Sequence, residues 1–294
     1  MVTIKLIHAV ITGILGGGVY ALMAVGLTLI FGVLDIINIA QGVMVVLGAY
    51  LSYALSVHLH LDLFVGLVIT VPVMFVIGVA IQWAFIRPLR GRERTSMSLL
   101  ASYAVAIIIE GLLYLVFGPN DVSLNASYVI SGVHLLGFYV PYIYLYGFGL
   151  AVALVLALYV LLYRTRFGQS VRATMQDRTA AMLVGIDVNR VSALTYGIGV
   201  AVTAAGGMVF GATGGGFNPY SGYDLISRLL ALIILGGLGS IGGALAASVL
   251  MLTLESVVDI WQPTWSVAVF YAALVLVLMF RPAGLFGRQL ARAQ

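Results

Sequence analysis

The stretch RTRFGQSVRATMQDRTAAMLVGIDVNR, residues 164–190, decides how this chain is arranged. It carries seven of the chain's 14 basic and 10 acidic side chains, and five of those seven are arginine. Long apolar runs precede and follow it, so it is not a loop between water-soluble elements. Because arginine-rich loops between membrane spans stay in the cytoplasm, we expect a cytoplasmic segment on which a soluble partner docks.

The composition sets the fold class. The 294 residues are 62% hydrophobic and 8% charged, with a mean hydropathy of +1.14, which leaves too little polar surface to coat a water-soluble globule. Several apolar runs exceed the about 20 residues that cross a bilayer as a helix. These runs are continuous rather than alternating, which excludes a β-barrel. We expect an all-α polytopic membrane protein that forms one transmembrane domain over residues 1–294.

The apolar runs predict eight or nine crossings, some of them broken or re-entrant. The expected spans are residues 6–34, 36–57, 63–86, 98–117, 142–163, 191–213, 229–254 and 265–280. GGLGSIGG, residues 236–243, splits one run, and it is either a true turn or a discontinuity within one segment. DIINIAQG, residues 35–42, interrupts the N-terminal half in the same way. Irregular backbone at membrane depth is tolerated where it lines a cavity.

Two further basic clusters fix the expected orientation. RPLRGRER, residues 87–94, follows the third span, and Arg281, Arg288 and Arg292 follow the last one. Residues 118–140 carry no lysine or arginine, and the aromatic run at 138–148 together with Tyr128 indicates a membrane–water interface. We therefore expect the N-terminus outside and the C-terminus in the cytoplasm.

A short helix is expected within the charged segment. The Asp177 carboxylate can cap a helix over residues 178–184, and Gly185 follows at the position that favours a left-handed backbone. The apolar knobs of this helix are Met182, Leu183 and Ile186, and its thin face carries Ala180 and Ala181. A helix of this kind fits a partner's groove, with Ala181 on the docking face. The alternative is a helix that lies flat on the membrane interface.

The same residues resemble a known family. TAAMLVG, residues 179–185, matches the EAA-x-x-x-G signature of ABC importer permeases, with Thr179 at the Glu position. The longer stretch FGQSVRATMQDRTAAMLVGIDVNRV, residues 167–191, is similar to the LivH-type branched-chain amino acid permease family. Four more stretches resemble the signatures of that family in its order, namely residues 26–50, 86–91, 235–248 and 280–287.

This resemblance implies the permease subunit of an ATP-binding-cassette importer in a bacterial inner membrane. The expected solutes are branched-chain or other small hydrophobic amino acids, delivered by a periplasmic binding protein. The expected partners are a second related permease and two cytoplasmic ATPases, which use ATP and Mg. The residues expected to couple to the ATPases are Arg172, Asp177, Thr179, Ala180, Ala181, Met182, Leu183, Gly185 and Ile186.

The chain itself is not expected to be an enzyme or to bind a cofactor. No stretch matches a phosphate-binding Walker A loop, so ATP hydrolysis belongs to separate subunits. The chain has no cysteine, and His58 and His60 lack a third ligand, so no metal site is expected. The solute itself stays open among aliphatic amino acids, amides, urea and small aromatic acids, as does the choice between a homomeric and a heteromeric permease pair.

Asn38 and Gln41 are the candidate residues of the translocation path. They interrupt an apolar stretch, and an amide within a membrane needs a partner or a water-lined cavity. Amides offer donors and acceptors to a zwitterionic solute without holding it by charge. The alternative is that both amides tie down the broken backbone between two helices.

The rival function is an ion-coupled secondary transporter or a channel for small solutes. It requires coupling acids within the membrane, and Glu110 in AIIIEGLL is the deepest acid. We expect Glu110 to form a polar contact between helices rather than part of a proton relay. Asp224 with Arg228, and Glu255 with Asp259, are four residues apart near outer ends, where they predict interfacial pairs or a docking surface.

Overall fold

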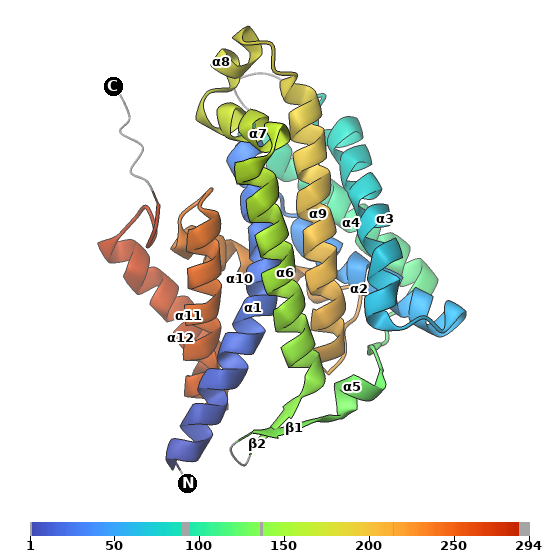
Figure 1. The fold of residues 1–294 in the computed structure, drawn as a ribbon, viewed down its shortest axis with the longest axis vertical. Helices are drawn as coiled ribbons and strands as arrows, with labels where there is room; N and C mark the ends of the chain where they lie inside the picture. Colours follow the sequence, from blue (N-terminus) through green and yellow to red (C-terminus); the bar gives the residue numbers. More distant parts are fainter. Residues whose placement is uncertain (1, 90–93, 136–137, 214, 288–294) are drawn as a thin grey trace.

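Long apolar helices build the structure, a computed structural model that describes residues 2–89, 94–135, 138–213 and 215–287 (Figure 1). Within these ranges, eight helical segments are long and apolar enough to cross a membrane, which confirms the predicted fold class. They are α1 (Val2–Leu34), α2 (Gln41–Leu59), α3 (Leu63–Ile81) with the π-helix η1 (Gln82–Ile86), α4 (Arg94–Phe117), α6 (Tyr142–Arg164), α9 (Val188–Thr213), α11 (Ile241–Asp259) and α12 (Pro263–Phe280). Arg90, Arg92, Arg288 and Arg292 lie outside the described residues.

The glycine-rich break at 236–243 is a true turn. The shorter buried helix α10 (Ser221–Gly236) ends there, and α11 begins at Ile241. An added Cβ at Gly236 would lie within 3.0 Å of the Gly243 backbone, so only glycine permits so close a turn. Thus α10 and α11 form a helical hairpin.

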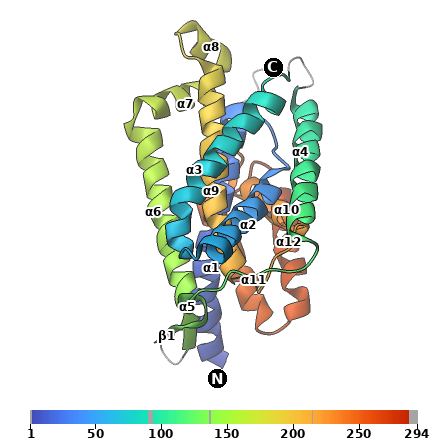
Figure 2. The ribbon, with the colours of Figure 1, turned by 90° about the vertical axis from the view of Figure 1, so that its right-hand side faces the viewer.

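Two further helices lie at the end of the bundle opposite the N-terminus. They are α7 (Arg166–Gln176) and α8 (Arg178–Leu183), and α8 projects beyond the long helices (Figures 1 and 2). The segment after α12 reaches the same end, where Leu285 N–H donates to the carbonyl of Leu235 near the end of α10. We call this the α8 end.

Basic side chains separate the two ends. The arginines with described side chains at the α8 end lie within α7 or close to the ends of other helices, and they are Arg87, Arg164, Arg166, Arg172, Arg178, Arg190 and Arg281. At the opposite end, Lys5 is the basic residue within the described part of the chain. This distribution is the one that marks the cytoplasmic side of membrane proteins.

The opposite end carries short elements that the sequence pattern did not predict. They are α5 (Ser127–Ile130) and an antiparallel hairpin of β1 (Gly132–Leu135) and β2 (Phe138–Pro141), in which Gly132 pairs with Pro141. Tyr128 and Tyr146, which both belong to the predicted aromatic belt, pack against each other and against Phe64. The Tyr128 hydroxyl donates to Asp62 Oδ2 at 2.8 Å. Burial and this bond raise the pKa of Tyr128.

Helix α9 is the central helix of the bundle. Most of its residues are buried, and it packs against α1, α2 and α3. At Gly26 of α1, Gly48 of α2 and Gly78 of α3, an added Cβ would come within 3.0 Å of α9. Small residues let membrane helices approach closely, and here they bring three helices onto one.

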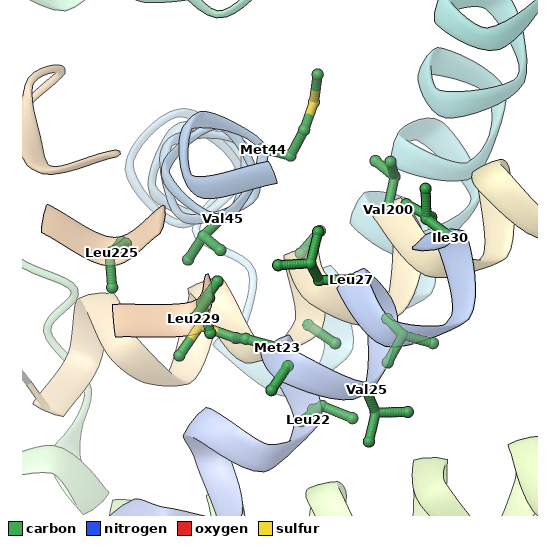
Figure 3. Packing of buried hydrophobic residues seen from close by; sticks show 14 of the residues in the cluster. Leu22, Met23, Val25, Leu27, Ile30, Met44, Val45, Val200, Leu225 and Leu229 are labelled. Atoms are coloured by element: carbon green, nitrogen blue, oxygen red, sulfur yellow. The ribbon is translucent and has the colours of Figure 1, made fainter. Parts of the chain in front are cut away.

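The apolar core fills the space around α9. Figure 3 shows Leu27 of α1, Met44 of α2, Val200 of α9 and Leu229 of α10 within one cluster of fully buried side chains. Because the exposed large apolar residues lie mainly on α3, α4, α6 and α12, these helices form the outer surface of the subunit. The polar residues described next are held between the core helices.

Candidate functional site

A non-helical segment enters the interior between α1 and α2. Helix α1 ends at Leu34, Asp35 takes a left-handed backbone with φ 54°, and α2 begins only at Gln41. The second span therefore begins five residues later than its predicted start at residue 36. Residues 36–40, which were predicted to belong to that span, are instead part of the irregular segment that the sequence predicted at residues 35–42.

The two candidate path residues lie together and are fully buried. The Asn38 Nδ2 donates to Gln41 Oε1 at 2.8 Å, and the Gln41 Nε2 donates to Thr203 Oγ1 at 2.6 Å. Thr203 is near the middle of α9, and Gly42 of α2 touches the first turn of α10 at Gly222. The amides thus lie in the interior, between α9 and the start of α10.

Thr203 and Tyr196 belong to this group and were not predicted. The Tyr196 hydroxyl faces the Asn38 amide, and its side chain is fully buried. A signal for both exists in the sequence, because polar side chains recur at helical spacing along residues 192–203. That spacing placed them on one face of a buried helix, but the pattern could not show which helix they face.

The short helix predicted within the charged segment is present, with the predicted Asp177 cap and Gly185 at its two ends. Asp177 Oδ1 accepts from the backbone N–H groups of Thr179 and Ala180, at 2.7 and 3.0 Å. Gly185 has φ 85°, and the N–H groups of Gly185 and Ile186 close on the carbonyls of Met182 and Ala181. This pair of bonds is the Schellman ending that favours glycine. The helix ends at Leu183, one residue before its predicted end.

The exposed face of α8 differs in part from the prediction. Leu183 is 84% exposed, Val184 is 76% exposed, and Met182, Thr179 and Ala180 are also exposed. The prediction that Ala181 lies on the docking face is wrong, because its side of the helix faces α7 and α9 and only 2% of it is exposed. Ile186 also turns inward and packs against the core.

Helix α7, which the sequence pattern did not predict, anchors α8 to the bundle. The Arg172 Nη1 donates to the Leu162 carbonyl at the end of α6, and its guanidinium lies 5.1 Å from the centre of the Tyr163 ring. Arg172 therefore fixes α7 to the end of α6 rather than projecting away from the bundle. Met175 of α7 packs against Gly32 near the end of α1.

Arg228 and Glu255 form an ion pair between two helices of the bundle. Arg228 of α10 contacts Glu255 of α11 at 2.9 and 3.0 Å, with 23% and 14% of the side chains exposed. The predicted pairing of Arg228 with Asp224 on its own helix is wrong, because the α10–α11 hairpin brings Glu255 closer. Glu110 lies against the Tyr223 hydroxyl of α10, which agrees with a polar contact between helices.

Comparison with known proteins gives a consistent result. Residues 9–278 match the family described as branched-chain amino acid transport system, permease component. The chain is 29% identical to the permease protein LivH of Escherichia coli strain K12, with 94% of each chain covered. It is 28% identical to BraD of Pseudomonas aeruginosa, with 96% of each covered. The LivM permease of Salmonella typhimurium is 24% identical over 91% of this chain and 67% of LivM.

Proposed function

This chain belongs to the family of permease components of branched-chain amino acid transport systems, and from that premise we propose that it is the membrane-spanning subunit of an ATP-driven importer. Members of this family are non-catalytic transmembrane subunits, and the family implies ATPase and binding-protein partners. The proposed solutes are branched-chain or other small hydrophobic amino acids, which the names of LivH and BraD support.

The exposed face of α8 is the observation that carries the proposal. Leu183 and Val184 are apolar and largely exposed on a helix that projects past the ends of the long helices (Figure 2). Arginine side chains surround its base, which supports a cytoplasmic location of this end, with the chain in the bacterial inner membrane and its C-terminus in the cytoplasm. An apolar knob pair on a rigidly capped helix fits a hydrophobic groove of a soluble partner. That partner is one of two ATPases, which use ATP and Mg.

The path for the solute runs past the buried amides. Asn38 and Gln41 form a hydrogen-bonded pair with Thr203 in the interior, where no charge would hold a zwitterion too tightly. We expect Asn38→Ala and Gln41→Ala to assemble normally and keep basal ATPase activity, while transport rate or solute preference changes. A loss of assembly in both variants would instead support the purely structural role of the amides.

The second permease is proposed to be a related but different chain. The similarity to LivM, another permease of the same kind of system, supports a heteromeric pair. The binding protein would dock at the opposite end, on the surface formed by α5 and the β1–β2 hairpin. Each of the two permeases then offers one docking helix to one ATPase.

Copurification tests the proposed function. The tagged chain, extracted in mild detergent from its native host, is expected to carry stoichiometric ATPase, and Leu183→Glu is expected to lose it. Met97→Glu, a matched change of an exposed apolar residue on α4, serves as the control. Purification of the wild-type chain without an ATPase, together with transport that does not require ATP, would favour the ion-coupled transporter.

A further inference from the structure

The exposed positions of helix α10 are polar. Within α10 the exposed residues are Asp224 and Ser227, and Tyr220, which caps the start of the helix, is 49% exposed. The exposed positions of α3 are instead all apolar, as expected of a helix in contact with lipid. The outward side of α10 therefore does not have the composition of a lipid-facing surface.

This polar side of α10 lies within the depth of the membrane. The first turn of α10 touches the start of α2, where Gln41 bonds to Thr203, about 15 Å before the end of α9. Glu110, which lies against Tyr223 of α10, is about 10 Å before the end of α4 and indicates the same depth. Asp224, next to Tyr223, is thus an exposed acid at a depth where hydrocarbon surrounds a membrane protein.

The two acids at this depth have no cationic partner within the described residues. Arg228, one turn after Asp224, is bound to Glu255 of α11. Glu110 lies against the Tyr223 hydroxyl, but its Oε2 is buried and has no hydrogen-bond partner. An ionisable side chain in contact with lipid is costly, and such residues almost always face protein or a water-filled cavity. We therefore expect another protein to shield these acids from lipid.

Helices α4 and α12 flank the polar side of α10. The ring of Tyr114 on α4 lies 6.2 Å from that of Tyr220, and the ring of Phe270 on α12 lies 5.8 Å from the Arg228 guanidinium. Figure 2 shows α4, α10 and α12 together on the side of the bundle opposite α6. The acids are therefore gathered on one side of the subunit, away from α6.

Helix α4 has open space beside the contact with α10. Gly111 is exposed, and an added Cβ there would have nothing around it. It precedes Tyr114 by three residues, so the two lie on neighbouring positions of the helix surface. Small residues let membrane helices approach closely, so another helix can pack here. We call the following residues of α4 and α10 the α10 face: Tyr103, Ile107, Glu110, Gly111, Tyr114, Tyr220, Tyr223, Asp224 and Ser227.

We propose that the α10 face is the surface on which the second permease packs, and that this partner supplies hydrogen-bond donors to Asp224 and Glu110. The inference rests on the proposed function, in which the partners are one permease, two ATPases and a binding protein. The ATPases are cytoplasmic and the binding protein is outside, so only the second permease reaches the depth of Asp224. Lipid is the competing occupant, but its hydrocarbon has no donor for a carboxylate.

Two matched glycines test the surface. Gly111→Leu on α4 and Gly149→Leu on α6 each add a side chain in open space, about 10 Å from the outer end of the helix. Both variants should keep or raise the thermal stability of the chain, since leucine favours a helix over glycine. The transporter is purified through a tag on this chain, and mass spectrometry measures the second permease. We expect Gly111→Leu to lose most of the second permease and Gly149→Leu to retain it.

The results separate this inference from the function on which it rests. Equal retention of the second permease by Gly111→Leu and wild type would overturn the α10 face and leave the proposed function standing. Loss with Gly149→Leu alone would move the interface to α6. Absence of both a second permease and an ATPase from the wild-type preparation would remove the proposed function, and the α10 face with it.

Substitution of Asp224 has different expected effects for lipid and for protein. If lipid covers the α10 face, Asp224→Leu removes a costly charge and should stabilise the chain without changing the assembly. If the second permease donates to the carboxylate, Asp224→Leu should reduce the retained permease several-fold. Asp224→Asn, which keeps an acceptor oxygen, should reduce it less. Full retention of the second permease by Asp224→Leu would contradict the proposed contact.

Discussion

The Met175 methyl of α7 lies 2.5 Å from the position that a Cβ would take at Gly32 of α1, and Gly239 of the α10–α11 turn lies close to the same point. Helix α7 therefore touches α1 three residues before the irregular segment at residues 35–40 begins. If a partner displaces α8 and α7, we expect this contact to move α1. Movement of α1 would in turn move the segment that holds Asn38.

Gly32→Ala is expected to loosen this coupling without unfolding the protein. The added methyl must displace Met175, whereas alanine favours a helix over glycine by roughly 1 kcal/mol. We expect fewer solutes transported per ATP hydrolysed. Gly16→Ala, on the same helix with open space around it, is the control, and Met175→Ala in the Gly32→Ala background should restore the ratio. An unchanged ratio in Gly32→Ala would show that motion does not pass through this contact.

Gly185→Leu tests the ending of α8. A leucine at φ 85° costs about 1–2 kcal/mol, so the last turn should fray and the apolar knobs should move. Gly185→Asn should be milder, because asparagine tolerates a left-handed backbone. Solute-stimulated ATPase activity should follow the order wild type, Asn, Leu. Full stimulation in Gly185→Leu would argue against a docking role for this turn.

Leu183→Glu and Ala181→Glu should have different effects, although they are two residues apart. Leu183 is almost fully exposed, so its substitution should change stability by less than about 0.5 kcal/mol and weaken ATPase binding. Ala181 is buried, so a charge there should destabilise α8 and α7. Thermal unfolding in detergent, measured beside ATPase copurification, distinguishes the two. Similar melting of both variants, with equal loss of the ATPase, would contradict the observed burial.

The Arg228–Glu255 pair should contribute to the α10–α11 hairpin. Removing one partner of a fully buried pair costs about 3–5 kcal/mol, and partial exposure reduces that here. Arg228→Gln and Glu255→Gln should each lower the melting temperature. The double variant should melt at a temperature close to that of either single variant, because the second substitution removes nothing further from the pair. Strict additivity in this double-mutant cycle would show that the pair is not energetically coupled.

Sequence patterns predicted most of the long helices because each is a continuous apolar run, and their ends shifted by a few residues. The run predicted at 229–254 instead divides at the glycine-rich turn into the second half of α10 and most of α11. The ends of α8 were also predictable, since Asp177 and Gly185 act through local backbone bonds. Helix α7 was missed because its buried side is defined by contacts with α6, α9 and α1, which are distant in the sequence or not visible in a local pattern. The burial of Ala181 and the Arg228–Glu255 pair depend on tertiary contacts that no local pattern contains.

The buried polar residues near Asn38 show the same division. Asn38 and Gln41 were recognisable because amides are rare within apolar runs. Thr203 and Tyr196 were not, since hydroxyl groups on an apolar span become informative only once α9 and residues 35–40 are brought together.

Single cysteines introduced into the cysteine-free chain test the predicted orientation. Thr179→Cys on α8 should react with an impermeant maleimide only in inverted vesicles, and Asn125→Cys at the opposite end only in right-side-out cells. Both side chains are exposed, so access to the reagent is set by the membrane alone. Labelling of Thr179→Cys from outside would reverse the orientation and remove the cytoplasmic docking surface.

Uptake by reconstituted vesicles tests the central claim most directly. The chain, purified with its copurifying permease and ATPases, is placed in proteoliposomes with ATP and Mg inside and a loaded binding protein outside. We predict accumulation of a radiolabelled branched-chain amino acid that requires internal ATP and that is lost with Leu183→Glu. Uptake that proceeds without ATP, or that persists at the wild-type rate with Leu183→Glu, would contradict an importer driven through α8.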